Sequence, residues 1–498
     1  MYFLFRNTNL FFEQGKIVTS YNIYLCVGSN VITFKFMQTI EKQITDTIRT
    51  IESFFSECFY EVSCTHDTLN KAVAKTQKKD DGFFFEFSKM TLPSQDERHK
   101  ITYAPTLPMK FSNNFKSIEF DLSNTKYNLS VGFSGYTSVS GYIKEFTTDS
   151  LKNHSNSYYR AVIIRESDHA LSGFFAHNNT LQIGTTTYGS GVLEINVKGI
   201  SLNLFTYTSK ETKRAYFIIE SQIICSYQDF ISLQDEIILA ITYLTGTFLG
   251  KEIYFIGSDT KSFEKNSVLS LKRFFDDLKN GYAAIPDVTL QHQVDVPVIR
   301  FPIKSFEKLI NELLNSVVYK RTLLLICQAY TEPPYVISTL YSVALETITN
   351  KISEEIKEKI KPIKEKEISQ SLRQELKQTL LTFKDKLTDE AFNKVASDID
   401  RVNSPTNKQK LLQPFKHLNV KLPSKDIEAV ERRNDFLHGR IPEENDKHYL
   451  SLINGRLLFC INCLVLKHIG FEGYIIYHPS IYQFKNNLRI EESLIRKI

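Results

Sequence analysis

Two repeats of apolar positions divide the chain. From Met37 to about Ala74, apolar residues recur at three- and four-residue spacing, which predicts a helix with one buried face. These residues are Ile40, Ile44, Ile48, Ile51 and Phe55. From about Gly82 to Ile224 the period falls to two, as in SIEFDL, YNLSVGF, and LEINV followed by ISLNL after a Lys-Gly pair. This second pattern predicts short antiparallel strands in a sandwich or a barrel-like sheet.

Glycines and prolines mark expected ends of these elements. The apolar run DFISLQDEIILAITYLTGTFLG is predicted to be a helix that ends at Gly250. The glycine pairs in GFSG (132–135) and GSG (189–191) fit neither a nucleophile elbow nor a phosphate loop, and hairpin turns are expected there. Residues 286–302 contain Pro286, Pro297 and Pro302, which favours a linker or an edge strand.

After Phe301 the strand signals largely disappear. Pro333 and Pro334 are expected to open a helix, Pro362 to kink or divide one, and RVNSPTNKQK to separate two others. The apolar segment KHYLSLINGRLLFCINCLVLKHIG is predicted to form the central helix of a bundle. The fold class expected is therefore α+β, with an antiparallel β-rich N-terminal domain followed by an all-α bundle.

The predicted organisation has four parts. Residues 1–36 are an N-terminal extension, interpreted either as a strand pair or as an overextended start. Residues 37–285 form the β-rich domain with its flanking helices, 286–302 the linker, and 303–498 the helical domain.

Composition changes this picture little. The 498-residue chain has a net charge of +5, which allows a polyanionic partner without requiring one. Seven scattered cysteines, an odd number, indicate reduced thiols in a cytoplasmic protein. No apolar run reaches the ~18 residues of a membrane span, and the N-terminus lacks the features of a signal peptide, so no membrane partner is expected.

The segment RRNDFLHGR, residues 432–440, carries the main candidate chemistry. It is predicted to end a helix at Gly439. Arginine offers a fixed cation to a phosphate, and histidine transfers protons near neutral pH, a pair suited to metal-free RNA cleavage. Arg433 and His438 lie about 140° apart on an ideal helix, so convergence needs an unwound last turn or a second subunit. The alternative is a plain helix end where both cations complement the dipole.

RNDFLH matches the R-x4-6-H signature of the HEPN ribonucleases, including the polar residue after the arginine. The helical context resembles the same family, with the motif directly before the last long helix. LYSVALETI is similar to an early HEPN helix, with Glu346 at a position that is often acidic. A β-rich region joined to such a domain resembles the ApeA-type anti-phage defence proteins.

The resemblance implies a cofactor- and metal-independent endoribonuclease of an abortive-infection system. Such proteins form homodimers or higher oligomers through the helical domain, with RNA as substrate, tRNA as a candidate, and a phage protein as the trigger. It assigns catalysis to Arg433, His438 and Asn434. It assigns supporting roles to Glu346 and Asp435, and RNA-binding roles to Arg432 and Arg440.

Other candidates compete with this interpretation. Cys460 and Cys463 form a C-x-x-C inside an apolar helix, where buried small residues explain them better than a metal. CFYEVSCTH groups Cys58, Cys64 and His66 without a clear fourth zinc ligand. The lysines and glutamates of 351–366 indicate a solvated helix face. A hydrolase that uses His169 is a weaker alternative, and a non-catalytic interaction protein with a ligand-binding sheet and an oligomerising helical domain is the main competitor.

Overall fold

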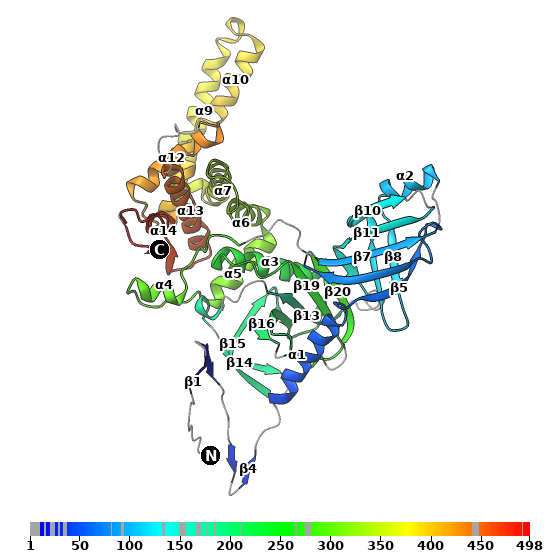
Figure 1. Cartoon of the computed structure of the whole chain (residues 1–498). Helices are drawn as coiled ribbons and strands as arrows, with labels where there is room; N and C mark the ends of the chain where they lie inside the picture. The colour runs from blue at the N-terminus through cyan, green and yellow to red at the C-terminus, as the bar shows by residue number, and fades with distance from the viewer. Residues whose placement is uncertain are drawn as a thin grey trace.

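A computed structural model describes most of the chain (Figure 1). The described residues are 10–13, 16–19, 25–27, 30–32, 37–80, 82–90, 94–131, 135–148, 156–165, 171–176, 178–183, 186–209, 211–263, 266–273, 280–440, 448–490 and 492–498. The β-rich region precedes the helical region, so the predicted α+β class is confirmed.

The N-terminal backbone forms two separate hairpins. Strand β1 (Leu10–Glu13) pairs with β2 (Lys16–Thr19), and β3 (Leu25–Val27) pairs with β4 (Asn30–Ile32). Helix α1 (Met37–Glu52) follows and buries Ile44, Ile48 and Ile51, as the three- and four-residue spacing predicts.

The predicted continuation of this helix to Ala74 is wrong. The next element is strand β5 (Cys58–Cys64), whose side chains at Tyr60 and Val62 are buried at every second position. The aromatic and β-branched residues of CFYEVSC favour an extended chain. Its apolar residues alternate with polar ones, but this short pattern was overlooked because the helical pattern before it was extended too far.

The β-rich region is one antiparallel sheet of sixteen strands among the described residues. Its strand order is β10-β11-β7-β6-β5-β8-β9-β12-β20-β19-β13-β17-β16-β15-β14, and β18 pairs with β13 off this path. The remaining strands are β6 (Val73–Lys79), β7 (Gly82–Lys89), β8 (Pro108–Ser112), β9 (Ser117–Asp121), β10 (Lys126–Val131), β11 (Thr137–Ile143), β12 (Glu145–Thr147), β13 (Asn156–Ile164), β14 (Asn178–Ile183), β15 (Thr186–Val197), β16 (Ile200–Thr208), β17 (Ala215–Ser221), β18 (Cys225–Ser226), β19 (Glu252–Ser258) and β20 (Asn266–Arg273). Figure 1 shows β5–β11 as a lobe beside α2 (Gln95–Tyr103), set apart from the lobe of β13–β17.

The glycine pairs behave differently from one another. Residues 132–134 lie outside the described part, but β10 and β11 on either side of GFSG are antiparallel neighbours. GSG is not a turn, because it lies inside β15. There the pairing with β14 shifts register between Asn178 and Thr180, so these glycines accompany a β-bulge. The predicted Lys-Gly turn is present: Lys198 and Gly199, both with positive φ, join β15 to β16.

Helices cover both faces of the second lobe. Along β13 the side chains of Tyr159, Ala161 and Ile163 belong to one core with helix α3 (Tyr227–Thr245), whereas Val162 belongs to the core beneath α1. With both faces buried, β19 has no residue that reaches intermediate exposure, which explains the apolar run IYFI at its centre.

A buried ion pair lies under α1. Arg160 and Glu220 are neighbours across β13 and β17, and 1% and 0% of their side chains are exposed. The Nη2 atom of Arg160 lies 2.5 Å from the Oε2 atom of Glu220. Arg160 also donates from Nη1 to Thr47 on α1 at 2.6 Å, and its guanidinium lies over the Phe263 ring. These contacts fix α1 on the sheet, because a buried arginine needs partners for its donors.

Helix α3 ends five residues before the predicted Gly250. Its C-cap is Gly246, at φ +69°, where the backbone turns left-handed. Gly250 has another role: a Cβ there would lie 2.1 Å from the Ile164 carbonyl oxygen, so the absent side chain lets this segment pass close to β13.

The helical region contains helices of different lengths that end near the predicted residues. They are α4 (Val288–Gln293), α5 (Ile303–Asn315), α6 (Val317–Ala329), α7 (Pro334–Glu355), α8 (Lys357–Ile360), α9 (Lys366–Leu381), α10 (Asp389–Asp400), α11 (Asn407–His417), α12 (Ser424–Leu437), α13 (Tyr449–His468) and α14 (His478–Lys485), with a hairpin of β21 (Tyr474–Ile476) and β22 (Ile495–Lys497). Pro333 and Pro334 open α7, and Pro362 separates α8 from α9. Ion pairs such as Lys361–Glu358 and Lys351–Glu355 occur in the lysine-rich stretch, as predicted for a solvated face.

The segment 286–302 is packed against its neighbours. Phe301 is buried and forms an isolated parallel bridge with Phe175, and Gln291 donates to the carbonyls of Pro286 and Ile299. One hydrophobic core contains side chains from β13, α3, α7 and α13. The β-rich and helical regions therefore share a core across this segment.

Helix α13 is central, as predicted. Among the described helices, α13 is long and apolar enough to cross a membrane, but 78% of its most apolar 18-residue window is buried inside the protein. Packing against α7 and the neighbouring helices accounts for its apolar sequence. Cys460 and Cys463 lie in this buried interior, and desolvation raises the pKa of both thiols.

Replacing Gly250 tests the close approach to β13. We expect Gly250→Ala to destabilise the protein by roughly 2 kcal/mol or more, since it combines a backbone clash with an unfavourable φ. Gly281→Ala is the matched control, because a Cβ there meets nothing within 4 Å. Apparent melting temperatures measure both effects, and equal values for the two variants would contradict the packing described.

Candidate active site

The segment 432–440 is the last turn of α12 and its cap. Gly439 has φ +69°. Its N–H donates to the Phe436 carbonyl at 3.2 Å, and the Arg440 N–H donates to the Asp435 carbonyl at 2.7 Å. This pair of bonds is the Schellman motif, which uses the free carbonyls of a helix end. The predicted helix stop at Gly439 is thus present, and α12 stays regular through Leu437.

Arg433 lies on the buried face of α12. Only 5% of the residue is exposed, and it shares this face with Ala429, Val430 and Phe436. Its Nε has no hydrogen-bond partner among the described residues. Desolvation lowers the pKa of the Arg433 guanidinium, and the negative charge of Glu346 on α7 partly offsets that shift. Arg433 is therefore a buried cation whose nearest compensation is a carboxylate outside ion-pair distance.

His438 and Asn434 lie on the exposed side of the same helix end. Both are solvent-exposed, and His438 is the C-cap residue. No hydrogen bond or ring contact joins Arg433 to His438 in the described part of the chain. Because α12 does not unwind before its cap, the first of the two predicted routes to convergence is absent. The second route, through another copy of the chain, stays a prediction.

The two flanking arginines share one carboxylate. Arg432 Nε lies 3.5 Å from Asp435 Oδ2, and Arg440 Nη1 lies 3.6 Å from Asp435 Oδ1. Arg432 also donates to the Tyr449 hydroxyl, and its guanidinium carbon lies 5.4 Å from that ring's centroid. Asp435 thus offsets part of the positive charge expected to hold RNA, while Arg440 stays 75% exposed.

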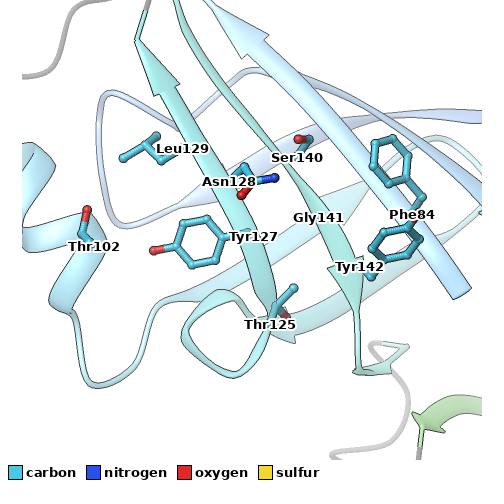
Figure 2. Close-up of a pocket in the computed structure, with 9 residues that line it drawn as sticks. All are labelled: Phe84, Thr102, Thr125, Tyr127, Asn128, Leu129, Ser140, Gly141 and Tyr142. Carbon is cyan, nitrogen blue, oxygen red and sulfur yellow. The ribbon is translucent and has the colours of Figure 1, made fainter. Parts of the chain in front are cut away.

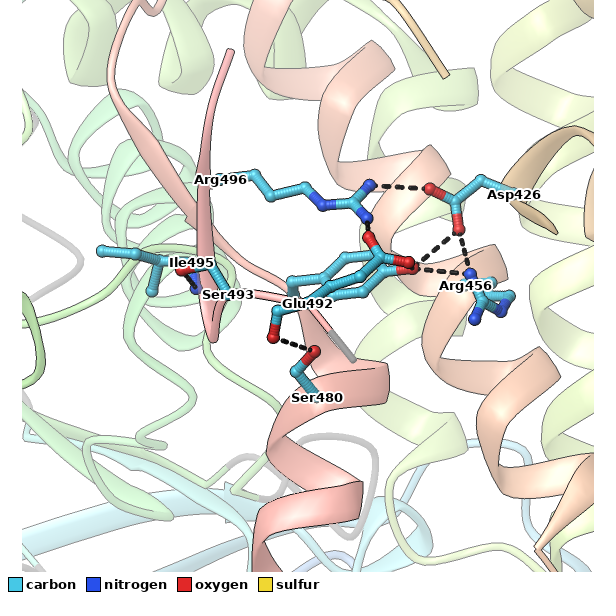
Figure 3. Close-up of polar contacts among 8 residues, drawn as sticks. Asp426, Arg456, Ser480, Glu492, Ser493, Ile495 and Arg496 are labelled. Carbon is cyan, nitrogen blue, oxygen red and sulfur yellow. Dashed lines mark hydrogen bonds and ion pairs between the residues drawn. The ribbon is translucent and has the colours of Figure 1, made fainter. Parts of the chain in front are cut away.

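An ionic cluster at the other end of α12 was missed by the sequence reasoning (Figure 3). Asp426 is fully buried, and its two oxygens accept from different arginines. Arg456 Nη1 on α13 donates to Oδ1 at 2.7 Å, and Arg496 Nη1 on β22 donates to Oδ2 at 2.8 Å. The Tyr477 hydroxyl donates to Oδ1 at 3.0 Å, and Glu492 pairs with Arg496.

This cluster determines where α12 lies. It joins α12 to α13 and to the C-terminal hairpin, two turns before Arg433 on the same helix face. Burial and Asp426 together raise the pKa of the Tyr477 hydroxyl. A sequence signal existed: Arg456 lies within a mainly apolar helix, and an arginine at such a position needs a buried partner.

The other candidate chemistry is not assembled. Cys58 and Cys64 lie at opposite ends of β5, and in the portion of the chain described no group of three or more His, Cys, Asp or Glu side chains is arranged to hold a metal. The His66 N–H donates to Cys64 Sγ, which is a local contact just after the end of β5. His169 falls in 166–170, outside the described residues.

A hollow of about 690 Å³ on the first β lobe offers a surface for the competing, non-catalytic interpretation (Figure 2). Phe84 and Tyr142 meet edge to face on one side, 5.3 Å between ring centroids. On the other side, the Tyr127 hydroxyl donates to the Ile101 carbonyl of α2 at 2.9 Å. Asn128 and Ser140 lie between them.

Comparisons with known proteins add no assignment. No family model matches the chain, and neither the curated proteins nor the solved structures contain a match.

Removing the Asp426 charge tests the role of the cluster. We expect Asp426→Asn to destabilise the protein by roughly 3–5 kcal/mol, since two buried or half-buried arginines lose their common partner. Asp435→Asn, at an exposed pair of arginines, should cost less than about 1 kcal/mol. Chemical denaturation measures the free energy of unfolding of both variants. If Asp426→Asn lowered it no more than Asp435→Asn, the cluster would not be what holds α12 in place.

Proposed function

We propose that this protein is a metal-independent endoribonuclease whose active site is built around the end of α12. The observation that carries the proposal is the placement of the motif: an exposed imidazole at a capped helix end, with a buried arginine five residues earlier whose Nε has no partner among the described residues. A charge buried without an ion pair is costly, and such costs are concentrated at functional sites.

The chemistry requires a base, an acid and a cation. A ribose 2′-hydroxyl attacks the adjacent phosphorus, its proton passes to one imidazole, and the 5′-oxygen leaves with a proton from another. The products are a 2′,3′-cyclic phosphate and a 5′-hydroxyl. One chain contributes a single His438 to this scheme, so two copies with their α12 ends together would provide both proton-transfer groups.

Arg433 would supply positive charge to the phosphorane, and Asn434, exposed beside it, a contact to a phosphate oxygen. Glu346 would keep the guanidinium in place from α7. Arg440 is the exposed flanking cation suited to the RNA backbone, and Arg432 is held more firmly by Tyr449. In this proposal Asp435 orients the two flanking arginines.

The β-rich region then has a regulatory role. It shares a core with α7 and α13, so a ligand on the sheet has a packed route to the helices that carry Glu346 and Arg433. We place the protein in the cytoplasm as the RNase of an abortive-infection system, with RNA as substrate, tRNA as the first candidate and a phage protein as the trigger.

Replacing His438 tests the activity. Wild type, His438→Ala and His417→Ala are incubated with total RNA and tRNA in EDTA. We expect His438→Ala to lose at least about 100-fold in cleavage rate, the usual contribution of a proton-transfer group. His417, also exposed at a helix end, is the matched control and should retain activity. Cleavage that is unchanged in His438→Ala would exclude this mechanism.

Replacing Arg433 separates catalysis from stability. Arg433→Met removes a buried cation that has no ion pair with any described residue, so we expect the melting temperature to hold or rise while cleavage is lost. Arg456→Met is the matched comparison, because it removes a buried arginine that is paired with Asp426 and should lower the melting temperature sharply. Full cleavage by Arg433→Met would show that this guanidinium has no part in the reaction.

A second function is favoured by one observation, the burial of Arg433 against the chain's own core. In that case the helix end is structural, and the protein is a non-catalytic scaffold that binds a partner through its aromatic-lined sheet and oligomerises through its helices. The hollow beside Phe84, Tyr127 and Tyr142 would be its binding surface. Absence of RNA cleavage by the wild-type protein, with and without phage lysate, would favour this function.

A further inference from the structure

The capped end of α12 lies beside the start of α13. Asp426 near the start of α12 contacts Arg456 in the middle of α13. Arg432, six residues further along α12, contacts Tyr449, the first residue of α13. The two helices therefore run antiparallel. Any opening beside the first turn of α13 is consequently at the same end of the helical region as His438.

A series of accessible side chains continues from Arg432 to α14. The Arg432 guanidinium carbon lies 5.4 Å from the Tyr449 ring centroid, and Arg432 and Arg440 pair with one carboxylate. His448, the exposed residue before Tyr449, has its Nδ1 atom 3.0 Å from the Tyr482 hydroxyl of α14. These side chains form a track, and none of its members is buried: Arg440, Arg432, Tyr449, His448 and Tyr482.

The track ends at a cavity of about 470 Å³. Tyr482 lines this cavity, and so does Ser451, which lies three residues after His448 and therefore on the same face of α13. Tyr282 and Tyr330 also line it, and their rings meet edge to face with centroids 4.8 Å apart. They are 38% and 40% exposed, so both side chains are open to solvent. The cavity is larger than one nucleobase, and aromatic walls are typical of sites for flat ligands.

A cation lies at each end of the track. Arg440 has 75% of its side chain exposed, and Lys485, one turn after Tyr482 on α14, is exposed and lines the cavity. Among the described lining residues the one acid is Glu332, which would repel a phosphate, so a bound strand would place its phosphates on the Lys485 side. Proteins that bind single-stranded nucleic acids combine cations along the phosphates with aromatic rings on which bases stack.

We propose that the track holds single-stranded RNA and that the cavity takes one unpaired base against Tyr282 and Tyr330. This inference rests on the proposed endoribonuclease, because it names the form of RNA that the α12 site receives. His438 is six residues beyond Arg432, about 9 Å along the axis of α12, so a few nucleotides along the track join the base in the cavity to a phosphate at the imidazole. A base inside a duplex is stacked and paired and cannot enter the cavity, so the substrate is an RNA loop or a single-stranded end.

Binding to the full chain tests the base site. In a non-cleaving His438→Ala background, fluorescence anisotropy compares a labelled RNA of about 12 nucleotides with an abasic strand of the same length and charge. We expect the RNA to bind at least about fivefold more tightly than the abasic strand, because the bases stack on the rings. Tyr330→Leu should remove this preference, and Tyr330→Phe, which keeps the ring, should retain it. Tyr335→Leu is the matched control, since Tyr335 is an exposed tyrosine of α7 outside the cavity lining.

A second variant tests the path of the phosphates. Lys485→Gln should weaken the RNA and the abasic strand by a similar factor, and the loss should shrink as the salt concentration rises. No binding of either strand, equal affinity for the two, or an unchanged preference in Tyr330→Leu overturns the inference.

The outcomes separate this inference from the proposed function. If the chain binds RNA with the Tyr330-dependent preference but wild type does not cleave it, the endoribonuclease fails and the base site stands. If wild type cleaves single-stranded RNA and Tyr330→Leu changes neither KM nor kcat, the base site fails and the endoribonuclease stands. Where both hold, Tyr330→Leu should raise KM at least about fivefold with little change in kcat, as expected for a contact made before and during the reaction.

Discussion

One buried carboxylate controls the geometry of the helical region. Asp426 has no exposed surface, and it compensates Arg456 on α13 and Arg496 on the C-terminal hairpin at the same time. This anion lies between two cations on separate elements, and Arg456 has no other carboxylate partner among the described residues, so the register of α12 against α13 is fixed. Because α12 is a regular helix, this register also determines that Arg433 is buried and that His438 is exposed.

The shared core sets a second constraint. Side chains from the sheet, from α3 and from the bundle pack in one continuous cluster, and Phe301 forms a bridge with Phe175 at the crossing. A packed protein interior has little free volume, so a displacement of side chains at one side of the core is accompanied by shifts elsewhere in it. In the proposed function, a ligand bound on the sheet would therefore have a packed route to α7, which carries Glu346.

Much of the fold could be predicted because the period of apolar residues and the positions of prolines are local signals. The strand pattern of SIEFDL, the turn at Lys198 and Gly199, and the helix stop at Gly439 all depend on a few neighbouring residues. The errors have two kinds of cause. CFYEVSC has a local strand signal that the longer helical pattern before it hid, whereas Gly250 is explained only by β13 passing beside it. The partners of Arg160 and Asp426 come from distant parts of the chain. Within the candidate site, the sequence predicted the cap and the burial of Phe436, but not that Arg433 lies on the same buried face of α12.

The hairpin of α9 and α10 projects from the bundle in Figure 1 and buries little: within these two helices only Ser369 and Leu380 are buried. Its base is held by the Asn403 side chain, which accepts from the Ile363 N–H at 2.7 Å and donates to the Ile363 carbonyl and the Ser369 hydroxyl. Ile368, Leu381 and Phe383 remain exposed along its length. An element that is anchored at one end and has few buried side chains unfolds locally at low free-energy cost. Its amides should therefore exchange with deuterium far sooner than those of α13. The far end of the hairpin should move relative to the base, where Asn403 holds the chain.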